Sequence, residues 1–429
     1  MPFSCDTFVA LGNSTAHGET LFAKNSDRPK DECQPLELHD RREHSKSART
    51  RCQFLEFDQA EATSRHVGSR PHWCWGYEHG FNEHQVVIGN EGLRSKFEFD
   101  EPKLIGMEVL RLGLERGRTA TEAVEIMTGL ISRHGQGKFA NSEDTRTYDN
   151  GYLVADPKEA LVIETAGHQW AVKQVDGTLG ISNVYSVEND HCQLSPDAIP
   201  VAVEKGWWNA ASKDFNFAEA YSFDENRTEG SGAMRRTRSC TVLQGKRGEI
   251  DVRCMMNLLS DHSDGNLADE PFVLDFEDSG GICVHSDSGI TAASLVADLC
   301  SDGSRLPIYW CSFYSPCLGI FFPVFIEGRL PEVLGVGEFR TSWMSPWWRF
   351  HKLLNLALEK PEERKPILRM EWSRIQNRFF EETGTIAREG KKLLDSGREE
   401  DAHMMLTNFM ETNTNIVLDK TEELLGKFR

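Results

Sequence analysis

The sequence predicts an α+β fold in which helices cover antiparallel sheets. Between residues 151 and 183, short segments of strand character follow one another and are separated by turns at Asp156-Pro157 and Asp176-Gly177. Strands spaced this closely pair antiparallel. Residues 102–134 have helical spacing instead, and so does most of the chain after residue 334. Strand-rich and helix-rich blocks of this kind are typical of the α+β class.

The composition is that of a large globular protein. A chain of 429 residues can form one large domain, or one domain with an appendage. The net charge of −19 argues against nucleic-acid binding, because the basic surface that phosphate recognition needs is missing. The longest apolar run, Cys317 to Ile326, is too short to cross a membrane, and the N-terminus lacks a signal-peptide pattern. We therefore expect no nucleic-acid partner and no membrane insertion.

Cysteine usage bears on location and on metal binding. The eleven cysteines are scattered without paired spacing, which indicates reduced thiols and a cytoplasmic protein. His39 and His44 share no recognised ligand spacing with nearby cysteines or carboxylates. The segment Asp261 to Gly265 has only part of a calcium-loop pattern. We therefore expect no metal and no cofactor.

The N-terminal stretch is the most informative part of the chain. Two short apolar runs, Thr7–Leu11 and Thr20–Ala23, flank a connection rich in Gly and polar residues, which predicts a hairpin. This hairpin returns Asp27 to the side of Cys5. A thiol near a chain end with a carboxylate beside it suits an N-terminal nucleophile.

The chemistry of such a nucleophile is specific. A cysteine that becomes residue one carries its thiol, with a pKa near ~8.5, beside a free α-amine with a pKa near ~8. The amine can then act as general base for its own thiol. This state requires the loss of residues 1–4, which we expect to follow attack of Cys5 on the Ser4 carbonyl and hydrolysis of the thioester. The alternative is a buried structural cysteine, which is common among free cysteines.

The segment from Trp73 to Glu83 is predicted to be a strand that runs into a turn, and Gln85–Gly89 a second strand that ends at Asn90. Trp73 and Trp75 would share one face of an extended segment. They would then either pack in the core or form an aromatic wall of a substrate pocket. Asn90 at the strand end is compatible with an ordinary turn residue.

Helices are predicted on both sides of the strand-rich block. Pro102 suits the first turn of a helix that Gly117 ends, and Thr119 with Glu122 forms a capping-box pattern at the start of the next. Near the C-terminus we expect helices from Pro346, from Ile367 to Leu394 with Pro361 and Pro366 as interruptions, and from Glu399 to Lys427. These helices either pack on the layers formed by the preceding strands and helices or offer a surface for homo-oligomer formation.

Two further places in the chain hold candidate site residues. Asn183 ends the predicted strand Gly180 to Asn183. Met234 to Arg238 is the most compact basic cluster in the middle of the chain, and a guanidinium there could hold a peptide carboxylate or pair with acidic neighbours.

Several short motifs occur together and in a fixed order along the chain. They are Cys5, Lys24-Asn25-Ser26-Asp27-Arg28-Pro29, Arg70-Pro71-His72-Trp73-Cys74-Trp75-Gly76, Asn82-Glu83, Gly89-Asn90-Glu91, Leu112-Gly113-Leu114-Glu115-Arg116-Gly117, His134-Gly135-Gln136-Gly137 and Ser315-Pro316-Cys317. In these motifs the sequence resembles the secernins. These belong to the cysteine dipeptidases of peptidase family C69, within the N-terminal nucleophile (Ntn) hydrolases. The resemblance extends to about Val333.

The resemblance implies a fold and a division of the chain. The expected fold is a four-layer αββα sandwich, with two antiparallel sheets between helical layers. Residues 1–4 would be a leader that self-processing removes. Residues 5–333 would form the catalytic domain, and residues 334–429 a helical C-terminal extension.

The resemblance also implies roles for individual residues. Cys5 would be the nucleophile, and Asp27 would orient its α-amine. Lys24 would support the site electrostatically, although related acylases carry arginine at this position. The oxyanion would be held by the backbone N–H of Asn90 and the side chain of Asn183.

For substrate binding we name Trp75 and Arg235. Related acylases have an arginine near the nucleophile, but the sequence does not decide which arginine between residues 235 and 238 corresponds to it.

The expected activity is hydrolysis of the amide bond of a short peptide, most simply a dipeptide. One alternative is a non-peptide amide hydrolase of the same mechanism, which a pocket lined by Trp73, Trp75 and Phe81 would favour. Another is a non-peptidase, secernin-like regulator of secretion.

Overall fold

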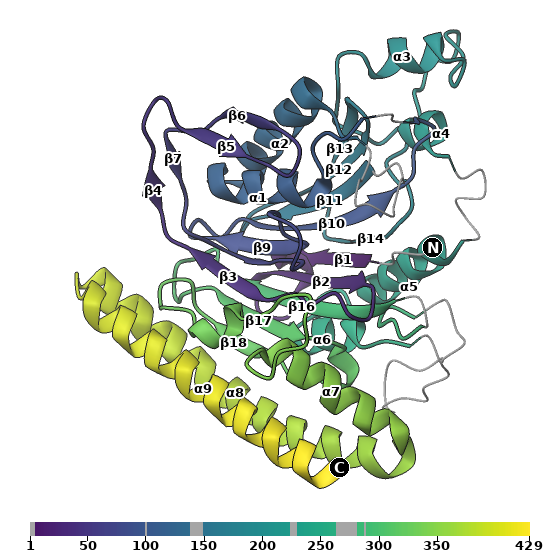
Figure 1. The fold of residues 1–429 in the computed structure, drawn as a ribbon. Helices are drawn as coiled ribbons and strands as arrows, with labels where there is room; N and C mark the ends of the chain where they lie inside the picture. Colours follow the sequence, from purple (N-terminus) through teal and green to yellow (C-terminus); the bar gives the residue numbers. More distant parts are fainter. Residues whose placement is uncertain (1–4, 99–100, 138–148, 224–229, 263–280, 287–288) are drawn as a thin grey trace.

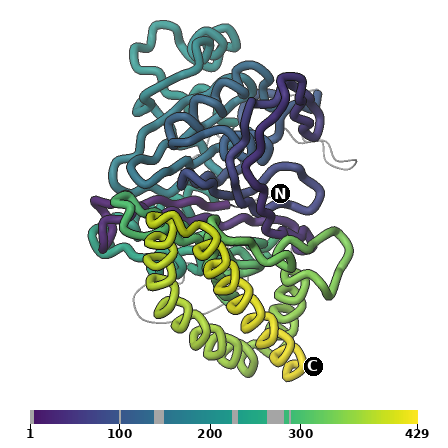
Figure 2. The backbone as a smooth tube through the Cα atoms, turned by 90° about the vertical axis from the view of Figure 1, so that its left-hand side faces the viewer, coloured from purple at the N-terminus to yellow at the C-terminus, as the bar shows by residue number. Residues whose placement is uncertain are grey.

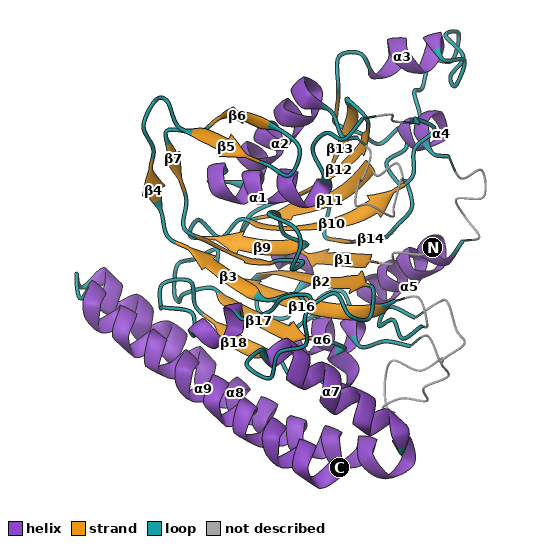
Figure 3. Ribbon diagram, viewed as in Figure 1, coloured by secondary structure: helices purple, strands orange, loops and turns teal. Residues whose placement is uncertain are grey.

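The computed structural model describes residues 5–98, 101–137, 149–223, 230–262, 281–286 and 289–429. The leader predicted at residues 1–4 lies outside them. Two antiparallel sheets face each other, and helices cover the outer side of each (Figure 1, Figure 3). The predicted four-layer αββα arrangement is therefore confirmed.

The first sheet has six strands and contains both strands of the predicted N-terminal hairpin. All its neighbouring strands are antiparallel. In spatial order the strands are β14 (Thr178–Ile181), β1 (Cys5–Ala10), β2 (Thr20–Arg28), β16 (Ile290–Leu299), β17 (Ile308–Phe313) and β18 (Phe322–Val324). The pairing of β1 with β2 confirms the hairpin.

The second sheet has eight strands and contains most of the strand-rich block. In spatial order they are β15 (Gln193–Leu194), β13 (Gln169–Gln174), β12 (Ala160–Ala166), β11 (Asp149–Ala155), β10 (Val87–Leu93), β9 (His79–Asn82), β8 (His66–Ser69) and β3 (Leu36–His39). Two small ribbons lie beside it: β4 (Arg42–Glu43) with β7 (Ala62–Thr63), and β5 (Arg49–Arg51) with β6 (Glu56–Asp58). β14 leaves this block and joins the other sheet.

Helices α1 (Gly106–Arg116) and α2 (Ala120–His134) cover the eight-stranded sheet. Half of the predicted capping box is present, since Thr119 Oγ1 accepts the backbone N–H of Glu122 at 3.1 Å, whereas the Glu122 carboxylate accepts the N–H of Arg118 at 2.9 Å. The short helices α3 (Ala198–Glu204) and α4 (Phe217–Tyr221) follow the sheet in sequence.

On the other side, α5 (Ser231–Gly245) packs on β14 and β1, and α6 (Val252–Leu259) packs on β2 and β16. The main apolar core lies between the two sheets, where Phe8, Phe22 and Phe81 are fully or almost fully buried. Phe81 stacks on Tyr309 with ring centroids 3.5 Å apart, so an aromatic pair bridges the two sheets.

The C-terminal helices are α7 (Pro346–Glu359), α8 (Pro361–Asp395) and α9 (Glu399–Phe428). They run along the base of the molecule and pack against β17 and β18 (Figure 2). Their apolar residues join the main core, so these helices pack on the layers that contain the two sheets, which is the first of the two predicted roles. Self-association through them stays a prediction. None of the helices among the described residues is long and apolar enough to cross a membrane.

Several local predictions were wrong. α1 begins at Gly106, so Pro102 lies before the helix and not in its first turn. Pro366 does not interrupt α8, because it lies in an early turn of a helix that already begins at Pro361. Trp73 to Glu78 form turns, and the strand begins only at His79. The turns bring Gly76 against the backbone of Met107, so closely that a Cβ on Gly76 would lie 2.2 Å from the Met107 carbonyl carbon. A straight strand could not make this approach.

Candidate active site

Cys5 begins β1 and lies at the open end of the N-terminal hairpin, away from the turn. Its partner across the hairpin is Ser26, and the next residue on β2 is Asp27. The backbone N–H of Asp27 donates to Cys5 Sγ at 3.4 Å, and the Sγ–H group lies 3.9 Å from the Asp27 carbonyl oxygen. The Cys5 residue is only 4% exposed. The hairpin thus brings the thiol and Asp27 together, as the sequence predicted.

Asn183 lies on the other side of Cys5. β14 pairs with β1 so that Ile181 is opposite Thr7, and Asn183 follows two residues later. The backbone N–H of Cys5 donates to Asn183 Oδ1 at 2.6 Å. Asn183 Nδ2 in turn donates to the carbonyl of Gly92 at 2.9 Å. The side chain therefore holds the nitrogen of Cys5 and is itself fixed by the facing sheet.

Arg235 of α5 fixes the same asparagine. One guanidinium nitrogen donates to Asn183 Oδ1 at 2.8 Å and to Ser182 Oγ at 2.8 Å. Its Nε forms an ion pair with Asp6 Oδ2 at 3.0 Å. Arg238, by contrast, pairs with Asp261. Arg235 is thus the arginine of this cluster that reaches Cys5, and it does so by holding Asn183.

Lys24 lies in a pocket of buried charge between the sheets. Its ammonium group is 3.5 Å from Glu91 Oε1 and donates to the carbonyl of Asn25 at 2.9 Å. Burial alone would lower the pKa of Lys24, but the neighbouring acidic groups raise it: Cys5 when it is ionised, and Glu91 and Glu78. Lys24 therefore stays positively charged at neutral pH.

The same environment acts on the acidic groups. Burial raises the pKa of the Cys5 thiol to about 12, and the Lys24 charge opposes the rise. Burial also raises the pKa of Glu91 to about 7, again with Lys24 as the main opposing influence. The thiol is therefore protonated at neutral pH, and its ionisation needs a base close by.

Asp27 is oriented from a third strand. Thr291 of β16 donates from Oγ1 to Asp27 Oδ1 at 2.6 Å. The β2–β16 ladder shifts register between Thr291 and Ala293, so Ala292 forms an irregularity directly beside this contact. The carbonyl of Ala292 accepts the indole N–H of Trp347 at 2.8 Å, which connects α7 to the site.

Asn90 lies inside β10, which continues to Leu93, so the prediction that Asn90 ends a strand was wrong. Its two polar groups have different surroundings. The backbone N–H makes a long contact of 3.4 Å with the Glu78 carbonyl oxygen. The carboxamide lies against Asn150 and Glu78 and not against Cys5. In this structure the Asn90 backbone N–H therefore faces the Glu78 carbonyl, and its role in an oxyanion site stays a prediction.

Trp75 is the predicted site residue that the structure does not bring to Cys5. Its ring lies under the Arg111 guanidinium, 4.0 Å from the ring centroid, at the outer core beneath α1. Trp73 is nearer to the site, since it contacts Arg28, which follows Asp27. Trp73, Trp75 and Phe81 therefore do not form one pocket wall.

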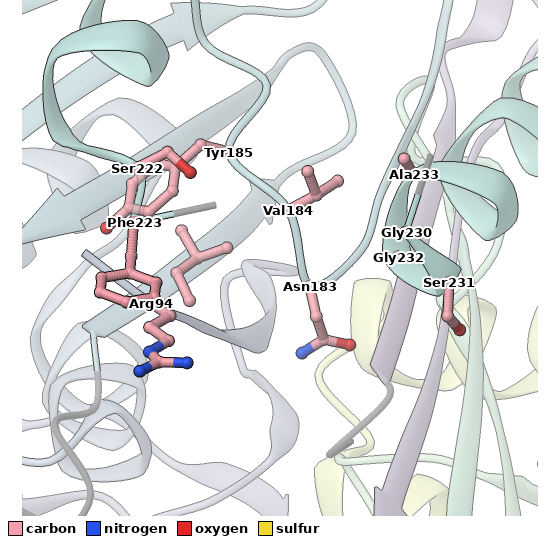
Figure 4. Close-up of a pocket in the computed structure, with 11 residues that line it drawn as sticks. Arg94, Asn183, Val184, Tyr185, Ser222, Phe223, Gly230, Ser231, Gly232 and Ala233 are labelled. Carbon is pink, nitrogen blue, oxygen red and sulfur yellow. The ribbon is translucent and has the colours of Figure 1, made fainter. Parts of the chain in front are cut away.

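A cavity of about 400 Å³ opens beside Asn183 (Figure 4). Its lining residues are Leu93, Arg94, Asn183, Val184, Tyr185, Ser222, Phe223, Gly230, Ser231, Gly232 and Ala233. The Arg94 guanidinium lies 3.8 Å from the centroid of the Phe223 ring. The first turn of α5, at Ser231 and Gly232, borders the cavity with its positive helix end. The cavity thus combines apolar walls with groups that attract a carboxylate.

Sequence reasoning did not find Glu91, Thr291 or Arg94. Glu91 stood inside a quoted motif, and its place next to Asn90 was the available signal. Arg94 follows three residues later on the same segment. Nothing in the local sequence marks Thr291, because its role depends on the pairing of strands that lie far apart in the chain.

Comparison with known proteins adds to this geometry. The sequence model of peptidase family C69 matches residues 4–235, which is more than half of the chain. The chain belongs to peptidase family C69. Members of a peptidase family hydrolyse peptide bonds, so the family places this chain among the hydrolases. All the predicted site residues lie within the matched range.

Comparison with solved structures gave further matches for this C69 member, at low identity. A mutant form of the conjugated bile acid hydrolase from Clostridium perfringens has a TM-score of 0.40 at 12% identity, over 72% of this chain and 89% of the other. The penicillin V acylase from Agrobacterium tumefaciens has a TM-score of 0.38 at 12% identity, over 75% and 86%. The N-acylethanolamine-hydrolyzing acid amidase ortholog of Caenorhabditis elegans has 0.33 at 14%, over 68% and 92%.

Proposed function

We propose that this C69 member is a cysteine-type dipeptidase whose nucleophile is Cys5 after removal of residues 1–4. The observation that carries the proposal is the 2.6 Å contact between the backbone nitrogen of Cys5 and Asn183 Oδ1. Burial of the sulfur alone would also fit a structural cysteine. The contact that favours a catalytic role is the one from Asn183 to the Cys5 nitrogen, which is the atom that becomes the α-amine, and Arg235 holds Asn183 in place.

The thiol and the backbone nitrogen of Cys5 also account for removal of the leader. Cys5 Sγ attacks the carbonyl carbon of Ser4, the Ser4–Cys5 C–N bond breaks, and the leader becomes a thioester on Sγ. Water then hydrolyses the thioester, so the leader leaves with a carboxylate and Cys5 keeps a free thiol and a free amine. Each step conserves the thiol for the later reaction.

The amine then supplies the base that the buried thiol lacks. It takes the Sγ proton, and the thiolate attacks the carbonyl carbon of the substrate. The Asn90 backbone N–H and Asn183 Nδ2 contact the carbonyls of Glu78 and Gly92 in the structure, and we propose that they hold the oxyanion when substrate displaces these contacts. Lys24 would provide positive charge near the sulfur. The resulting ammonium protonates the leaving amine, and water cleaves the acyl-thioester to regenerate the site.

The cavity beside Asn183 supports a short, carboxylate-bearing substrate. Its volume of about 400 Å³ suits a small molecule, and Arg94 with the first turn of α5 provides positive charge at its wall. A dipeptide presents both a small acyl group and a C-terminal carboxylate. Leu93 and Phe223 give the cavity an apolar side, which would suit an N-acyl amide if the enzyme acts on a non-peptide substrate instead.

All eleven cysteines are free thiols in the structure, which supports the proposal of a reducing, cytoplasmic location.

Intact mass spectrometry tests the nucleophile, and a substrate panel tests the specificity. Wild-type protein should lack the mass of residues 1–4, while Cys5→Ala should retain it. Cys192→Ser, an exposed cysteine, is the matched control and should be processed normally. A folded but unprocessed wild type would refute the mechanism. Hydrolysis of dipeptides in preference to N-acyl amides and bile-salt-like amides would support the dipeptidase, and the reverse order would support the acylase.

A further inference from the structure

Outside the candidate active site, two histidines and two cysteines converge from separate segments. They are His262, Cys283, His285 and Cys317. His262 follows α6, Cys283 and His285 precede β16, and Cys317 lies in the short 3₁₀ helix Pro316–Leu318. Their potential ligand atoms all lie within 4.8 Å of one another. Both cysteines are buried, with 2% and 7% exposure.

The distances approach those of a metal tetrahedron. Zn–S bonds of ~2.3 Å and Zn–N bonds of ~2.0–2.1 Å place neighbouring ligand atoms roughly 3.3–3.8 Å apart. His285 Nε2 lies 3.5 Å from Cys283 Sγ and 3.1 Å from Cys317 Sγ. The His262 ring stacks on the His285 ring with centroids 5.1 Å apart. The four potential ligand atoms are thus close to tetrahedral separations, and those at up to 4.8 Å would have to approach one another on metal binding.

We propose that His262, Cys283, His285 and Cys317 bind a structural Zn²⁺ ion. Two thiolates and two imidazoles are the donor set that zinc takes in tetrahedral sites, whereas calcium and magnesium require oxygen ligands. Four protein ligands fill the coordination sphere, so the ion would have no open position for catalysis. The sequence predicted no metal, because these ligands come from three segments and only Cys283 and His285 are close in the chain.

The backbone already holds the ligand segments in place. The N–H groups of Ile282 and Cys283 both donate to the carbonyl of Asp261, each at 2.9 Å, so the residues before His262 and at Cys283 are joined directly. A zinc ion would add a second connection between these segments and Cys317. It would tie α6, the start of β16 and the 3₁₀ helix together beneath the six-stranded sheet.

This connection leads to the active site through one residue. Val284, between the two ligands Cys283 and His285, donates its N–H to Thr291 Oγ1 at 2.9 Å. The same hydroxyl donates to Asp27 Oδ1 at 2.6 Å. The zinc ion would therefore position Thr291 and, through it, the carboxylate of Asp27, without touching the substrate. Zinc binding itself does not depend on the proposed peptidase activity, whereas the positioning of Asp27 rests on that proposed function.

Metal analysis of the full-length protein tests the site directly. After purification with added Zn²⁺ and gel filtration, we expect one zinc per chain by elemental mass spectrometry. X-ray absorption at the zinc edge should show two sulfur and two nitrogen neighbours. Cys317→Ser and His262→Ala should lose the ion, while Cys311→Ser, a buried cysteine on β17 outside the cluster, should keep it.

A measurement on the wild type guards against variants that do not fold. Replacement of the metal with Co²⁺ should give the visible absorption of tetrahedral cobalt with thiolate ligands, and a chelator should abolish it and lower the melting temperature. The proposal would be overturned by any of three results. These are a wild type that retains no zinc after incubation with Zn²⁺ and gel filtration, a cobalt spectrum without thiolate bands, and a Cys283–Cys317 disulfide in the native protein. Full zinc content in a folded Cys317→Ser, His262→Ala double variant would also overturn it.

Discussion

Arg235 and Asp6 form an ion pair, with Nε and Oδ2 3.0 Å apart and side-chain exposures of only 2% and 0%. Removal of one partner would leave the other charge buried without compensation, which typically costs about 3–5 kcal/mol. We therefore expect Arg235→Gln to lower the free energy of unfolding by about this amount. Denaturant unfolding followed by circular dichroism measures it.

The double variant distinguishes the pair from two independent effects. Asp6→Asn combined with Arg235→Gln should cost less than the sum of the single changes, because the neutral groups need no counter-charge. Arg49→Gln provides the control, since Arg49 forms a surface ion pair at 44% exposure and should cost at most about 1 kcal/mol. Strict additivity would contradict the ion pair as described.

Gly89 makes room for Lys24. A Cβ at this position would lie 3.0 Å from Lys24 Cδ, 3.0 Å from Thr7 Oγ1 and 3.2 Å from the Phe22 ring. Gly89→Ala should therefore destabilise the fold by about 1–3 kcal/mol and displace Lys24 from Glu91. Gly129→Ala is the matched control, because a Cβ there meets nothing within 4 Å and should stabilise α2 by about 0.5–1 kcal/mol. Equal effects at the two sites would refute the steric argument.

Asn183 and Asn90 should respond differently to truncation. Asn183→Ala removes the carboxamide that contacts the Cys5 nitrogen, and loss of one oxyanion donor typically lowers kcat by roughly 10²–10³-fold. Asn90→Ala keeps its backbone N–H, so its effect on kcat should be smaller. Steady-state kinetics on processed protein of confirmed fold measures both. A larger loss of kcat in Asn90→Ala than in Asn183→Ala would contradict the assignment of the side-chain oxyanion donor to Asn183.

Asp149 should make stability depend on pH. Burial raises its pKa from 3.8 to about 7, against the opposing hydrogen bonds from Ser95 and from the Gly167 N–H. Between pH 3.8 and about pH 7, Asp149 keeps its proton in the folded protein but has released it in the unfolded chain. The free energy of unfolding should therefore fall as pH rises, by roughly 1.4 kcal/mol per pH unit from this group.

Asp149→Asn removes the ionisation and should flatten that slope. Glu61→Gln, at an exposed position, should leave the slope unchanged. Urea unfolding at a series of pH values across the window gives the comparison. A slope in Asp149→Asn equal to that of the wild type would show that Asp149 does not hold the proton.

The parts of the site that sequence could predict depend on local structure. A hairpin is a short-range feature, so the position of Asp27 beside Cys5 followed directly from the two apolar runs. The helix cap at Thr119 is equally local. Asn183 was named through resemblance, but its contact with Cys5 depends on β14 leaving its neighbours to pair with β1 in the other sheet.

The rest depends on tertiary packing that no window of sequence contains. Thr291 reaches Asp27 only because β16 pairs with β2. Trp75 was assigned to a strand because aromatic residues favour strands, but the close approach of Gly76 to α1 imposes turns there. Local preference lost to packing at that place, and the ring lies beneath α1 instead of beside Cys5.

The contact between Trp347 and Ala292 has a consequence for any shortened form of the protein. A chain that ended at residue 333 would retain every residue of the proposed reaction and also the strands that carry them. It would lose the indole that donates to the Ala292 carbonyl beside Thr291, although the backbone N–H of Tyr314 would still donate to that carbonyl. It would also lose the helices that pack on β17 and β18. Such a fragment would carry the reacting groups with part of their support removed, because that support comes from the opposite end of the polypeptide.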